Sequence, residues 1–521
     1  MLKVRFDKRL VVESREYAKT IATDIYNRFI KGFSTDSIER TTLRFLGIEG
    51  STSYGHPKVN AVVDAIKRQY DITGGVLNYI AHEMAVSQVD FLSAVDIIIN
   101  GTLSTLKPSK EALDRAKGEI EEIARKKYDE IVSKRVMRER FRNSFPPQKR
   151  PLKYLIVATG NIYDDVIQAI SAAEAGADII AVIRSTAQSL LDYVPEGATT
   201  EGYGGTYATQ ENFRIMRSAL DDASKRLNRY IYLTNYSSGL CMPEIAYLGA
   251  FEGLDVLLND AMYGILFRDI NMKRTFCDQF FSRMICAISK IIINTGEDNY
   301  LTTSDAMERA HTVLTSLFIN EAFARLAGMR EEYMGLGHAF EINPQIEDSL
   351  SFELSQALLI RQIFPRSPIK YMPPTKHMTG DPFYSNLLDA MFNLTSKLSS
   401  QHIHLLGMMT EAMHNPLMMD RYESLKNVNY IFNAVSTLSE QITIKKDSLL
   451  NKRAQEVLHR AYELLKKVRD EGLDRAISEG EFADIKRFSD SGKGVDGVYK
   501  VRDDYFNPVF NLLIEKTGGE R

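Results

Sequence analysis

The stretch that decides the fold is residues 154–184, YLIVATGNIYDDVIQAISAAEAGADIIAVIR. A short apolar run ends at Gly160, residues with helical spacing continue to Gly176, and a second apolar run ends at Arg184. A glycine just past a helix suits the C′ position, where the backbone takes a positive φ. Short apolar runs that alternate with amphipathic helices indicate β-α units and a parallel sheet.

The same rhythm continues through the middle of the chain. Helical patterns separate the apolar runs, for example over residues 209–226, 303–328 and 346–364. Eight connections of this kind are typical of a (β/α)8 TIM barrel, an α/β fold that we favour over a doubly wound open sheet. The eight apolar runs begin near Tyr154, Ala177, Tyr230, Leu254, Lys290, Tyr333, Pro368 and His402.

The segments on either side of this pattern are helical. Residues 109–145 are charged, with apolar residues at helical spacing, and Pro146-Pro147 ends the pattern. Residues 425–480 are also helical, with acidic residues between the basic ones. We therefore predict an N-terminal helical region over residues 1–150, a barrel over 151–420 and a C-terminal helical region over 421–521.

Composition narrows the possible partners and the location. The 521 residues include 65 basic and 68 acidic side chains, a balance that gives no reason to expect nucleic acid or an anionic membrane as partner. The chain shows neither a signal-peptide pattern nor an apolar run long enough to cross a bilayer. Its three cysteines are too few for a disulfide framework or a thiolate metal site, so we expect a cytoplasmic protein.

The chemistry of a TIM barrel lies at the carboxyl ends of its strands. The second strand ends in Arg184, and a guanidinium beside hydroxyl donors at the start of a helix suits a phosphate. An ordinary helix cap with a surface arginine is the alternative reading. The residues that follow Arg184 are Ser185, Thr186, Ala187, Gln188 and Ser189.

Polar residues also follow the next three strands. Each group alone could be ordinary loop polarity, but together they favour a site for a phosphate-bearing aromatic ligand. Tyr263 could stack on the ring of such a ligand, and an acidic residue could bind a substrate amine. These residues are Ser237 and Ser238 after the third strand, Asn259, Asp260, Tyr263 and Arg268 after the fourth, and Glu297, Asp298 and Asn299 after the fifth.

Other features carry weaker signals. The glycine-rich connection over residues 192–213 is unusually long but matches no phosphate-binding fingerprint. His402 and His404 could face one side of a strand, yet no third ligand supports a metal site, and core or rim positions are favoured. His377 lies in HMTG, which lacks the aspartate of the cobalamin-binding D-x-H-x-x-G pattern, and Lys376 is the lysine best placed for a Schiff base.

The quoted strand ends resemble a known family. Residues 183–222, together with NYSSGL at 235–240, MYGILFRD at 262–269 and NTGEDNY at 294–300, are similar to the large α subunit of the lysine 5,6-aminomutases. The resemblance runs nearly end to end. It implies a TIM barrel with accessory helices and a radical isomerisation in lysine fermentation, in which the terminal amino group of D-lysine or L-β-lysine moves from C6 to C5. The product would be 2,5- or 3,5-diaminohexanoate.

The resemblance also implies cofactors, a partner and site residues. Pyridoxal 5′-phosphate and adenosylcobalamin are the expected cofactors, and a small β subunit with a Rossmann-like domain would supply the cobalt ligand and the Schiff-base lysine in an α2β2 assembly. Arg184 to Ser189, Ser238, Tyr263, Arg268 and Asn299 are expected to contact pyridoxal phosphate or its adduct. Tyr263 and Asp298 are the predicted catalytic residues, and no metal ligand is expected on this chain.

Two other functions remain open at this point. One is a cobalamin-independent pyridoxal enzyme acting on a basic amino acid, with Lys376 as the Schiff-base lysine. The other is a non-catalytic scaffold subunit, for which substitution of Arg184, Tyr263 and Arg268 would have little consequence for turnover.

Overall fold

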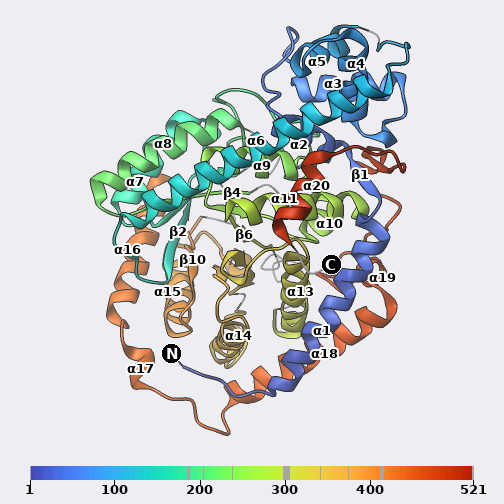
Figure 1. Cartoon of the computed structure of the whole chain (residues 1–521). Coiled ribbons are helices and arrows are strands. Elements are labelled where there is room, and N and C mark those ends of the chain that lie inside the picture. The colour runs from blue at the N-terminus through green and yellow to red at the C-terminus, as the bar shows by residue number, and fades with distance from the viewer. Residues whose placement is uncertain are drawn as a thin grey trace.

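A closed parallel β-barrel forms the centre of the protein. The computed structural model describes residues 2–101, 103–184, 188–202, 205–236, 239–296, 306–340, 342–373, 375–410 and 416–518. Its main sheet has the order β7-β6-β5-β4-β3-β2-β10-β9-β8. Strands β7 (Met334–Gly335) and β8 (Gly337–Ala339) are separated only by Leu336, so the two edges of the sheet belong to one stretch of chain. Eight strand positions therefore close into the predicted TIM barrel, which is confirmed (Figure 1).

The barrel strands lie in the eight predicted apolar runs, and all neighbouring pairs are parallel. Parallel strands need a crossover between them, which the intervening helices supply. The remaining strands are β2 (Leu152–Ile156), β3 (Ile179–Arg184), β4 (Tyr232–Tyr236), β5 (Val256–Leu258), β6 (Ile292–Asn294), β9 (Lys370–Met372) and β10 (Ile403–Leu405).

A layer of helices surrounds the barrel. The chemistry that starts and stops these helices is local: the Asn161 side chain accepts a hydrogen bond from the Tyr163 N–H at 3.0 Å, and Gly176 takes a φ of +111° just past the same helix. The helices are α7 (Ile162–Glu174), α8 (Gln210–Leu227), α9 (Met242–Glu252), α10 (Tyr263–Arg268), α11 (Met272–Ser289), α13 (Ala306–Leu326), α14 (Ser349–Ile363), α15 (Pro382–Leu398) and α16 (Met418–Ala434).

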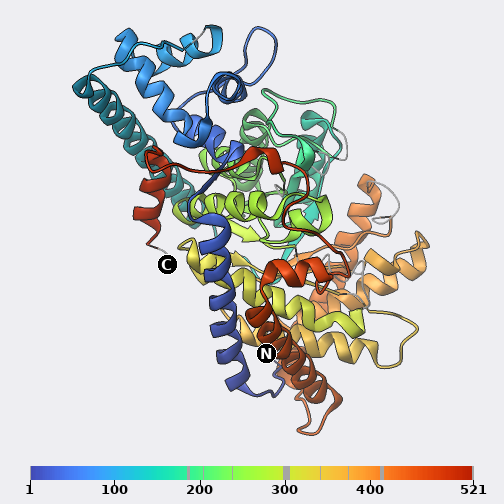
Figure 2. The same cartoon turned by 90° about the vertical axis from the view of Figure 1, so that its right-hand side faces the viewer.

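The two ends of the chain meet on one flank of the barrel. Helix α1 (Lys8–Ile25) packs along α18 (Leu449–Glu471), and both contact α13 (Figure 2). Strand β1 (Phe33–Thr35) pairs antiparallel with β11 (Val498–Lys500) in a separate two-stranded sheet. The N-terminal and C-terminal segments therefore pack together in one accessory layer on this flank.

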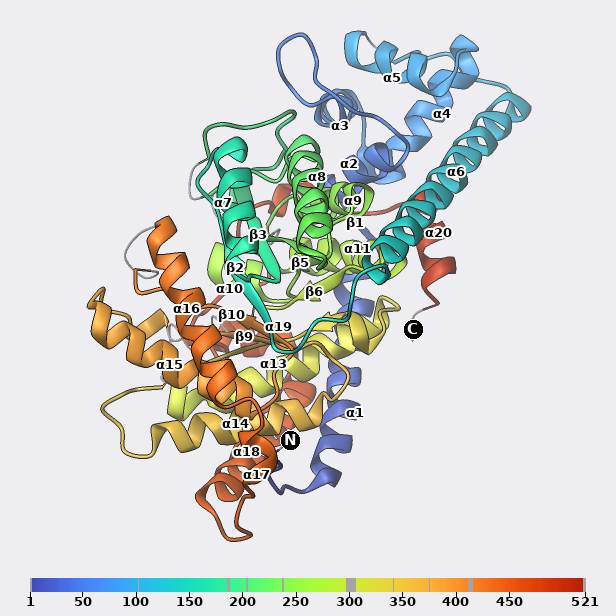
Figure 3. The same cartoon turned by 90° about the vertical axis from the view of Figure 1, so that its left-hand side faces the viewer.

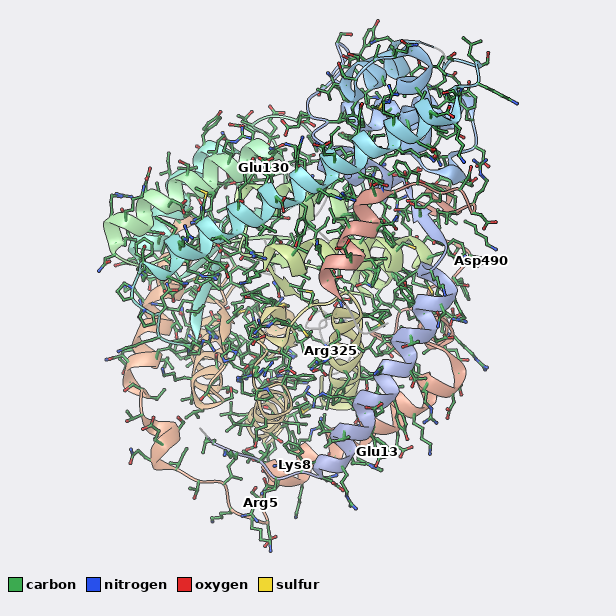
Figure 4. All side chains as sticks on the ribbon, viewed as in Figure 1. Arg5, Lys8, Glu13, Glu130, Arg325 and Asp490 are labelled. Carbon is green, nitrogen blue, oxygen red and sulfur yellow. The ribbon has the colours of Figure 1, made fainter. Side chains whose placement is uncertain are left out.

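A second part of this layer crosses the neighbouring helices of the barrel. Helix α6 (Lys110–Asn143) confirms the long helix predicted over residues 109–145, and it passes over α9 and α11. At its far end a small cluster projects from the barrel (Figure 3); its helices are α3 (Lys58–Gln69), α4 (Val76–Ser87) and α5 (Phe91–Asn100). Figure 4 marks the two sides with Glu130 on α6 and Glu13 on α1.

The remaining helices close gaps between these layers. Helix α2 (Asp36–Phe45) packs on α9, and α20 (Pro508–Thr517) packs on α11. Two short helices, α17 (Leu438–Gln441) and α19 (Leu473–Glu479), flank α18. In the described part of the chain no helix is both long enough and apolar enough to span a membrane.

Candidate functional site

Side-chain contacts show which strand residues face the inside of the barrel. Lys153 donates a hydrogen bond to Asn429 of the surrounding helix α16 at 2.9 Å, so it points outward. Its neighbour Tyr154 therefore points inward, because side chains alternate along a strand. Strand pairing extends the inward set to Tyr236 on β4 and Asn294 on β6. The Tyr154 hydroxyl donates to the Tyr236 hydroxyl at 2.8 Å, across the intervening strand β3.

The loops after β5 and β6 are joined by one buried carboxylate. Asp260 is fully buried and accepts hydrogen bonds from the N–H groups of Met262 at 2.6 Å and Tyr263 at 2.8 Å through one oxygen. Its other oxygen accepts from the Gly296 N–H at 2.8 Å. Asp260 was predicted as a strand-end residue, and it fixes the start of α10 against the loop after β6.

Tyr263 and Arg268, both predicted site residues, come together on α10. The Arg268 Nη2 donates to the Tyr263 hydroxyl at 3.1 Å, and the guanidinium carbon lies 5.4 Å from the ring centroid. The other side of the ring lies against Gly296, where an added Cβ would be 2.7 Å from Tyr263 Cδ2. Only a glycine at position 296 therefore leaves room for the ring. Arg268 places a positive charge beside the ring hydroxyl.

The loops after β3 and β4 also approach closely. The Leu240 N–H donates to the Ser189 carbonyl at 3.1 Å. An added Cβ on Gly239 would lie 2.4 Å from Ser189 Cα, so only glycine allows the two backbones to come so near. The structure thus places predicted residue Ser189, which is 7% exposed, beside the end of β4.

Gln188 binds the long connection that follows β3. Its side-chain nitrogen donates to the Ala208 carbonyl at 3.0 Å, and its oxygen accepts from the Ala208 N–H at 2.7 Å. The Thr206 hydroxyl is bound to Asp165 on α7. Both contacts hold the predicted long loop close to the strand ends. Gln188 uses both its amide oxygen and its amide nitrogen for this purpose.

Several predicted site residues lie outside the described part of the chain. The side chain of Arg184, whose backbone ends β3, is among them. The contacts expected between this chain and a phosphate therefore remain predictions. The residues themselves are Ser185, Thr186, Ala187, Ser237, Ser238, Glu297, Asp298 and Asn299.

A buried network of charges ties the accessory layer to these loops. Arg40 and Arg44 of α2 donate to the two oxygens of Glu244 on α9, at 2.7 and 2.8 Å. Glu244 is fully buried. Burial acts to raise the pKa of Glu244, but the two guanidinium charges outweigh it and bring the pKa below its ordinary value. The pair of arginines therefore holds α2 on the barrel helix that follows β4.

The same network reaches the long connection and α11. Asp192 of the connection binds Arg40 and also accepts from Arg274 at 2.9 Å. Burial opposes its ionisation, yet Arg40 and Arg274 lower the pKa of Asp192 to about 2. Arg274 also donates to Asp278 at 2.9 Å and to the Leu240 carbonyl at 3.1 Å. The loops after β3 and β4 are thus fastened to both the accessory layer and the barrel.

Two residues that point into the barrel, Lys370 on β9 and Asn294 on β6, were not predicted from the sequence. His338 on β8 and Tyr371 on β9 both bind Glu353 of α14, at 3.1 and 2.5 Å, so they point outward. Lys370 therefore points into the barrel, where it is 1% exposed. Asn294, also 1% exposed, faces the same interior. Period-2 alternation within each apolar run was the signal that could have found them.

The predicted weak signals occupy other positions. His402 binds the Ser367 carbonyl at 2.8 Å and His404 binds Asn393 of α15 at 2.6 Å, so both face the helix layer. Lys376 and His377 form a short helical turn after β9, where Lys376 is exposed. Among the residues that the structure describes, no three His, Cys, Asp or Glu side chains are grouped to hold a metal ion.

The residues at the strand ends fit an anionic aromatic cofactor. They offer a tyrosine ring with an adjacent guanidinium, two close backbone approaches at Gly239 and Gly296, and a buried polar amide at Asn294. A flat aromatic ligand needs a ring face and small neighbouring residues, and an anionic one needs a cation and N–H donors.

Comparisons with known proteins agree with this arrangement. The family described as "D-Lysine 5,6-aminomutase TIM-barrel domain of alpha subunit" matches residues 4–512. The lysine 5,6-aminomutase alpha subunit of Fusobacterium nucleatum is 51% identical over 522 residues and covers 100% of both chains. The protein of that name from Acetoanaerobium sticklandii is 50% identical over 99% of each chain. A D-ornithine 4,5-aminomutase subunit beta from Acetoanaerobium sticklandii is 27% identical, covering 70% of this chain and 50% of its own.

Proposed function

Because the chain belongs to the family of lysine 5,6-aminomutase alpha subunits, we propose that it is the large catalytic subunit of such an isomerase. Its substrate would be D-lysine or L-β-lysine, whose terminal amino group moves from C6 to C5. The cofactors would be pyridoxal 5′-phosphate and adenosylcobalamin. A small β subunit would complete the site in an α2β2 assembly and supply the cobalt ligand.

The observation that carries this proposal is the Tyr263 ring at the end of β5. The ring is held from three directions, by Asp260 at its backbone, by Arg268 at its hydroxyl and by Gly296 against its edge. A rigid aromatic face of this kind suits the pyridine ring of pyridoxal phosphate. Arg268 lies where it would reach an anionic group of the cofactor or the substrate carboxylate.

The phosphate would be held at the ends of β4 and β3, which are one and two strands away from β5. Arg184, Ser189 and Ser238 are the proposed phosphate ligands. The segment from Ser185 to Gln188 is expected to contact pyridoxal phosphate or its adduct. Support comes from the close approach of Gly239 to Ser189, because it brings the ends of β3 and β4 within reach of one small anion. Asn299 and Asp298 would complete the site from the loop after β6.

This chain would orient and enclose the reactants rather than perform the bond cleavage. The bound cofactors supply the radical and the conjugated imine that carries the migrating nitrogen. The residues of this chain would fix the pyridine ring, neutralise the phosphate and keep water from the barrel mouth. Arg268, by donating to the Tyr263 hydroxyl, also fixes the orientation of that ring.

Two further proposals concern the chain as a whole. We place the functional division at residues 150 and 420, although α16 crosses the second boundary. A cytoplasmic location is consistent with three cysteines that are all free and buried. Burial raises the pKa of the Cys286 thiol to about 12, so that thiol is unreactive.

The test is turnover of D-lysine with both cofactors, with and without the small subunit. We expect no turnover by this chain alone and full turnover when the partner is added. Tyr263→Ala should lower kcat/KM at least tenfold, whereas Tyr430→Ala, at a residue 74% exposed on α16, should have no effect.

Two results would replace the proposal. Conversion of lysine by this chain alone, without cobalamin, would indicate a self-contained pyridoxal enzyme. Unchanged turnover in the Tyr263→Ala holoenzyme would indicate a scaffold subunit.

A further inference from the structure

The Asn294 carboxamide is a buried polar group without a partner inside the barrel. The side chain is 1% exposed, and neither its oxygen nor its nitrogen has a hydrogen-bond partner within the described part of the protein. We propose that Asn294 binds the cofactor–substrate complex directly and donates its Nδ2–H to an anionic oxygen of that complex. The proposal rests on the proposed function and adds a residue that the strand-end pattern did not select.

The position of Asn294 is set by strand pairing. It is the last residue of β6 and pairs with Leu258 on one side and Gly335 on the other. Leu258 offers only an apolar side chain and Gly335 offers none, so the neighbours at this level cannot satisfy an amide. Asn294 is two residues before Gly296, which lies against Tyr263. The carboxamide therefore lies two residues deeper along the strand than the glycine that contacts the Tyr263 ring.

Two other buried amides near this site, Asn259 and Asn320, are bound by the protein. The Asn259 side chain binds Ser282 and accepts from Arg283 Nε at 3.1 Å. The Asn320 oxygen accepts from Arg283 Nη2 at 2.6 Å and from the Ala261 N–H at 3.1 Å. These contacts brace the helix layer behind β5. Asn294 differs because it points into the barrel rather than toward the helices.

The barrel interior near Asn294 has the polarity of a ligand site. The Thr234 hydroxyl on β4 points inward with Tyr236 and is also buried without a partner among the described residues. The buried amino group of Lys370 faces the same space. An unpaired buried amide is unfavourable, and one that points into a ligand site is satisfied when the ligand binds.

The chemistry of the carboxamide selects the oxygen it would bind. Its –NH2 group donates two hydrogen bonds, which suits the ring oxygen of pyridoxal or the carboxylate of lysine. Both are anionic oxygens, and the amino group of Lys370 in the same interior can donate a hydrogen bond to either. Loss of a hydrogen bond to a charged group costs about 1.5–3 kcal/mol, which corresponds to a loss of affinity of about ten- to hundredfold.

The experiment replaces the amide with an apolar side chain of the same size. Asn294→Leu removes the two unsatisfied atoms, so the large subunit without ligands should unfold about 1–3 °C higher than wild type. In the holoenzyme the same variant should bind its ligands about ten- to hundredfold more weakly. If pyridoxal phosphate affinity falls without substrate, the ring oxygen is the partner; if only KM for D-lysine rises, it is the carboxylate.

Gln279→Leu is the matched control. Gln279 on α11 is another fully buried amide with neither atom paired among the described residues, but it lies on a helix outside the barrel interior. Its replacement should raise thermal stability and leave both affinities unchanged. Asn294→Asp provides a second test, because a carboxylate at the same place would repel the anionic oxygen and weaken binding more than leucine does.

The result that overturns the inference is specific. If Asn294→Leu lowers thermal stability and leaves cofactor affinity and KM unchanged, the amide has a structural role. If Asn294→Leu does not fold, unchanged affinities in Asn294→Asp have the same meaning. Wild-type turnover of lysine is measured first; its absence counts against the proposed function, whereas wild-type turnover with unaffected variants counts only against the role of Asn294.

Discussion

Two buried polar regions of this protein differ in how their groups are satisfied. In the Arg40–Glu244 network, each carboxylate oxygen of Glu244 faces a guanidinium nitrogen, and Asp192 and Asp278 pair with Arg274. One guanidinium nitrogen of this network, Arg44 Nη2, has no partner among the described residues. Inside the barrel, the Asn294 amide and the Thr234 hydroxyl have no such partners within the described residues. The first region has the pattern of an internal joint, and the second has the pattern of a site completed by a ligand.

The largest expected effect tests the first region. Glu244→Gln would leave Arg40 and Arg44 buried without their shared carboxylate. Each arginine would keep only its more exposed partner, Asp192 for Arg40 and Glu196 for Arg44, so we expect the free energy of unfolding to fall by about 3 kcal/mol. Denaturant unfolding of the holoenzyme measures it. The control is Glu211→Gln, which removes an exposed pair with Arg214 and should change stability by less than about 1 kcal/mol.

The pH dependence of this joint has a definite sign. Since its arginine partners bring the pKa of Glu244 below the ordinary value of 4.5, the pair stabilises the folded chain above that pH. The contribution is lost as pH falls through the lower folded pKa. If Glu244→Gln unfolds like wild type at neutral pH, the network is not what holds α2 to the barrel.

The next effect tests how closely the site is packed. Gly296→Ala places a methyl group 2.7 Å from the Tyr263 ring and must move it. Overpacking of this kind costs about 1–3 kcal/mol, so pyridoxal phosphate should bind about tenfold more weakly or worse. In Gly264→Ala, on α10 beside Tyr263, the added methyl group meets its nearest side-chain atom at an ordinary 3.5 Å, so this variant should bind the cofactor as wild type does. Equal affinities in the two variants would remove Tyr263 from the ring site.

The barrel could be predicted because local sequence patterns determine its strands and helices. Each strand run and the glycine at 176 are signals within a few residues. The pairing of β1 with β11 and the bond from Arg40 to Glu244 join residues far apart in the chain, so no local pattern reports them. The break at Leu336 between β7 and β8 was not predicted either, since it leaves the apolar run intact.

The candidate site was predicted where chemistry and position coincide. Tyr263, Arg268 and Asp260 combine polar side chains with a strand end, and the structure brings them together. Gln188 shares that position, but its amide binds the backbone at Ala208, which only the folded loop reveals. Asn294 lies inside the strand rather than after it, so reading only the residues beyond each strand passed over it.

A smaller effect separates the Tyr263 ring from its hydroxyl. Tyr263→Phe keeps the aromatic face and removes the acceptor for Arg268 Nη2. One neutral acceptor contributes about 0.5–1.5 kcal/mol, so kcat/KM should fall about two- to tenfold, less than in Tyr263→Ala. If Phe and Ala variants lose the same activity, the hydroxyl rather than the ring face carries the role of this residue.

The smallest effect concerns a buried group in the helix layer. Burial lowers the pKa of His404 to about 3, from an ordinary value of 6.5. Its ring stacks on the Phe392 ring with 4.3 Å between the ring centroids, and its Nε2 lies 2.6 Å from Asn393 Oδ1. Between those two pH values the unfolded chain binds a proton that the folded chain does not, so the free energy of unfolding falls as pH drops from 6.5 toward 3.

His404→Gln should therefore reduce this acid sensitivity without changing turnover at neutral pH. Glutamine keeps an N–H donor for Asn393 but has no group to protonate in this range. His402, whose pKa burial also lowers to about 3, leaves part of the slope in place. The measurement is thermal unfolding between pH 4 and 7 beside His459→Gln, at an exposed residue of α18. A variant slope equal to that of wild type would mean that water already reaches the His404 ring, and that the helix layer is less tightly closed than the site it surrounds.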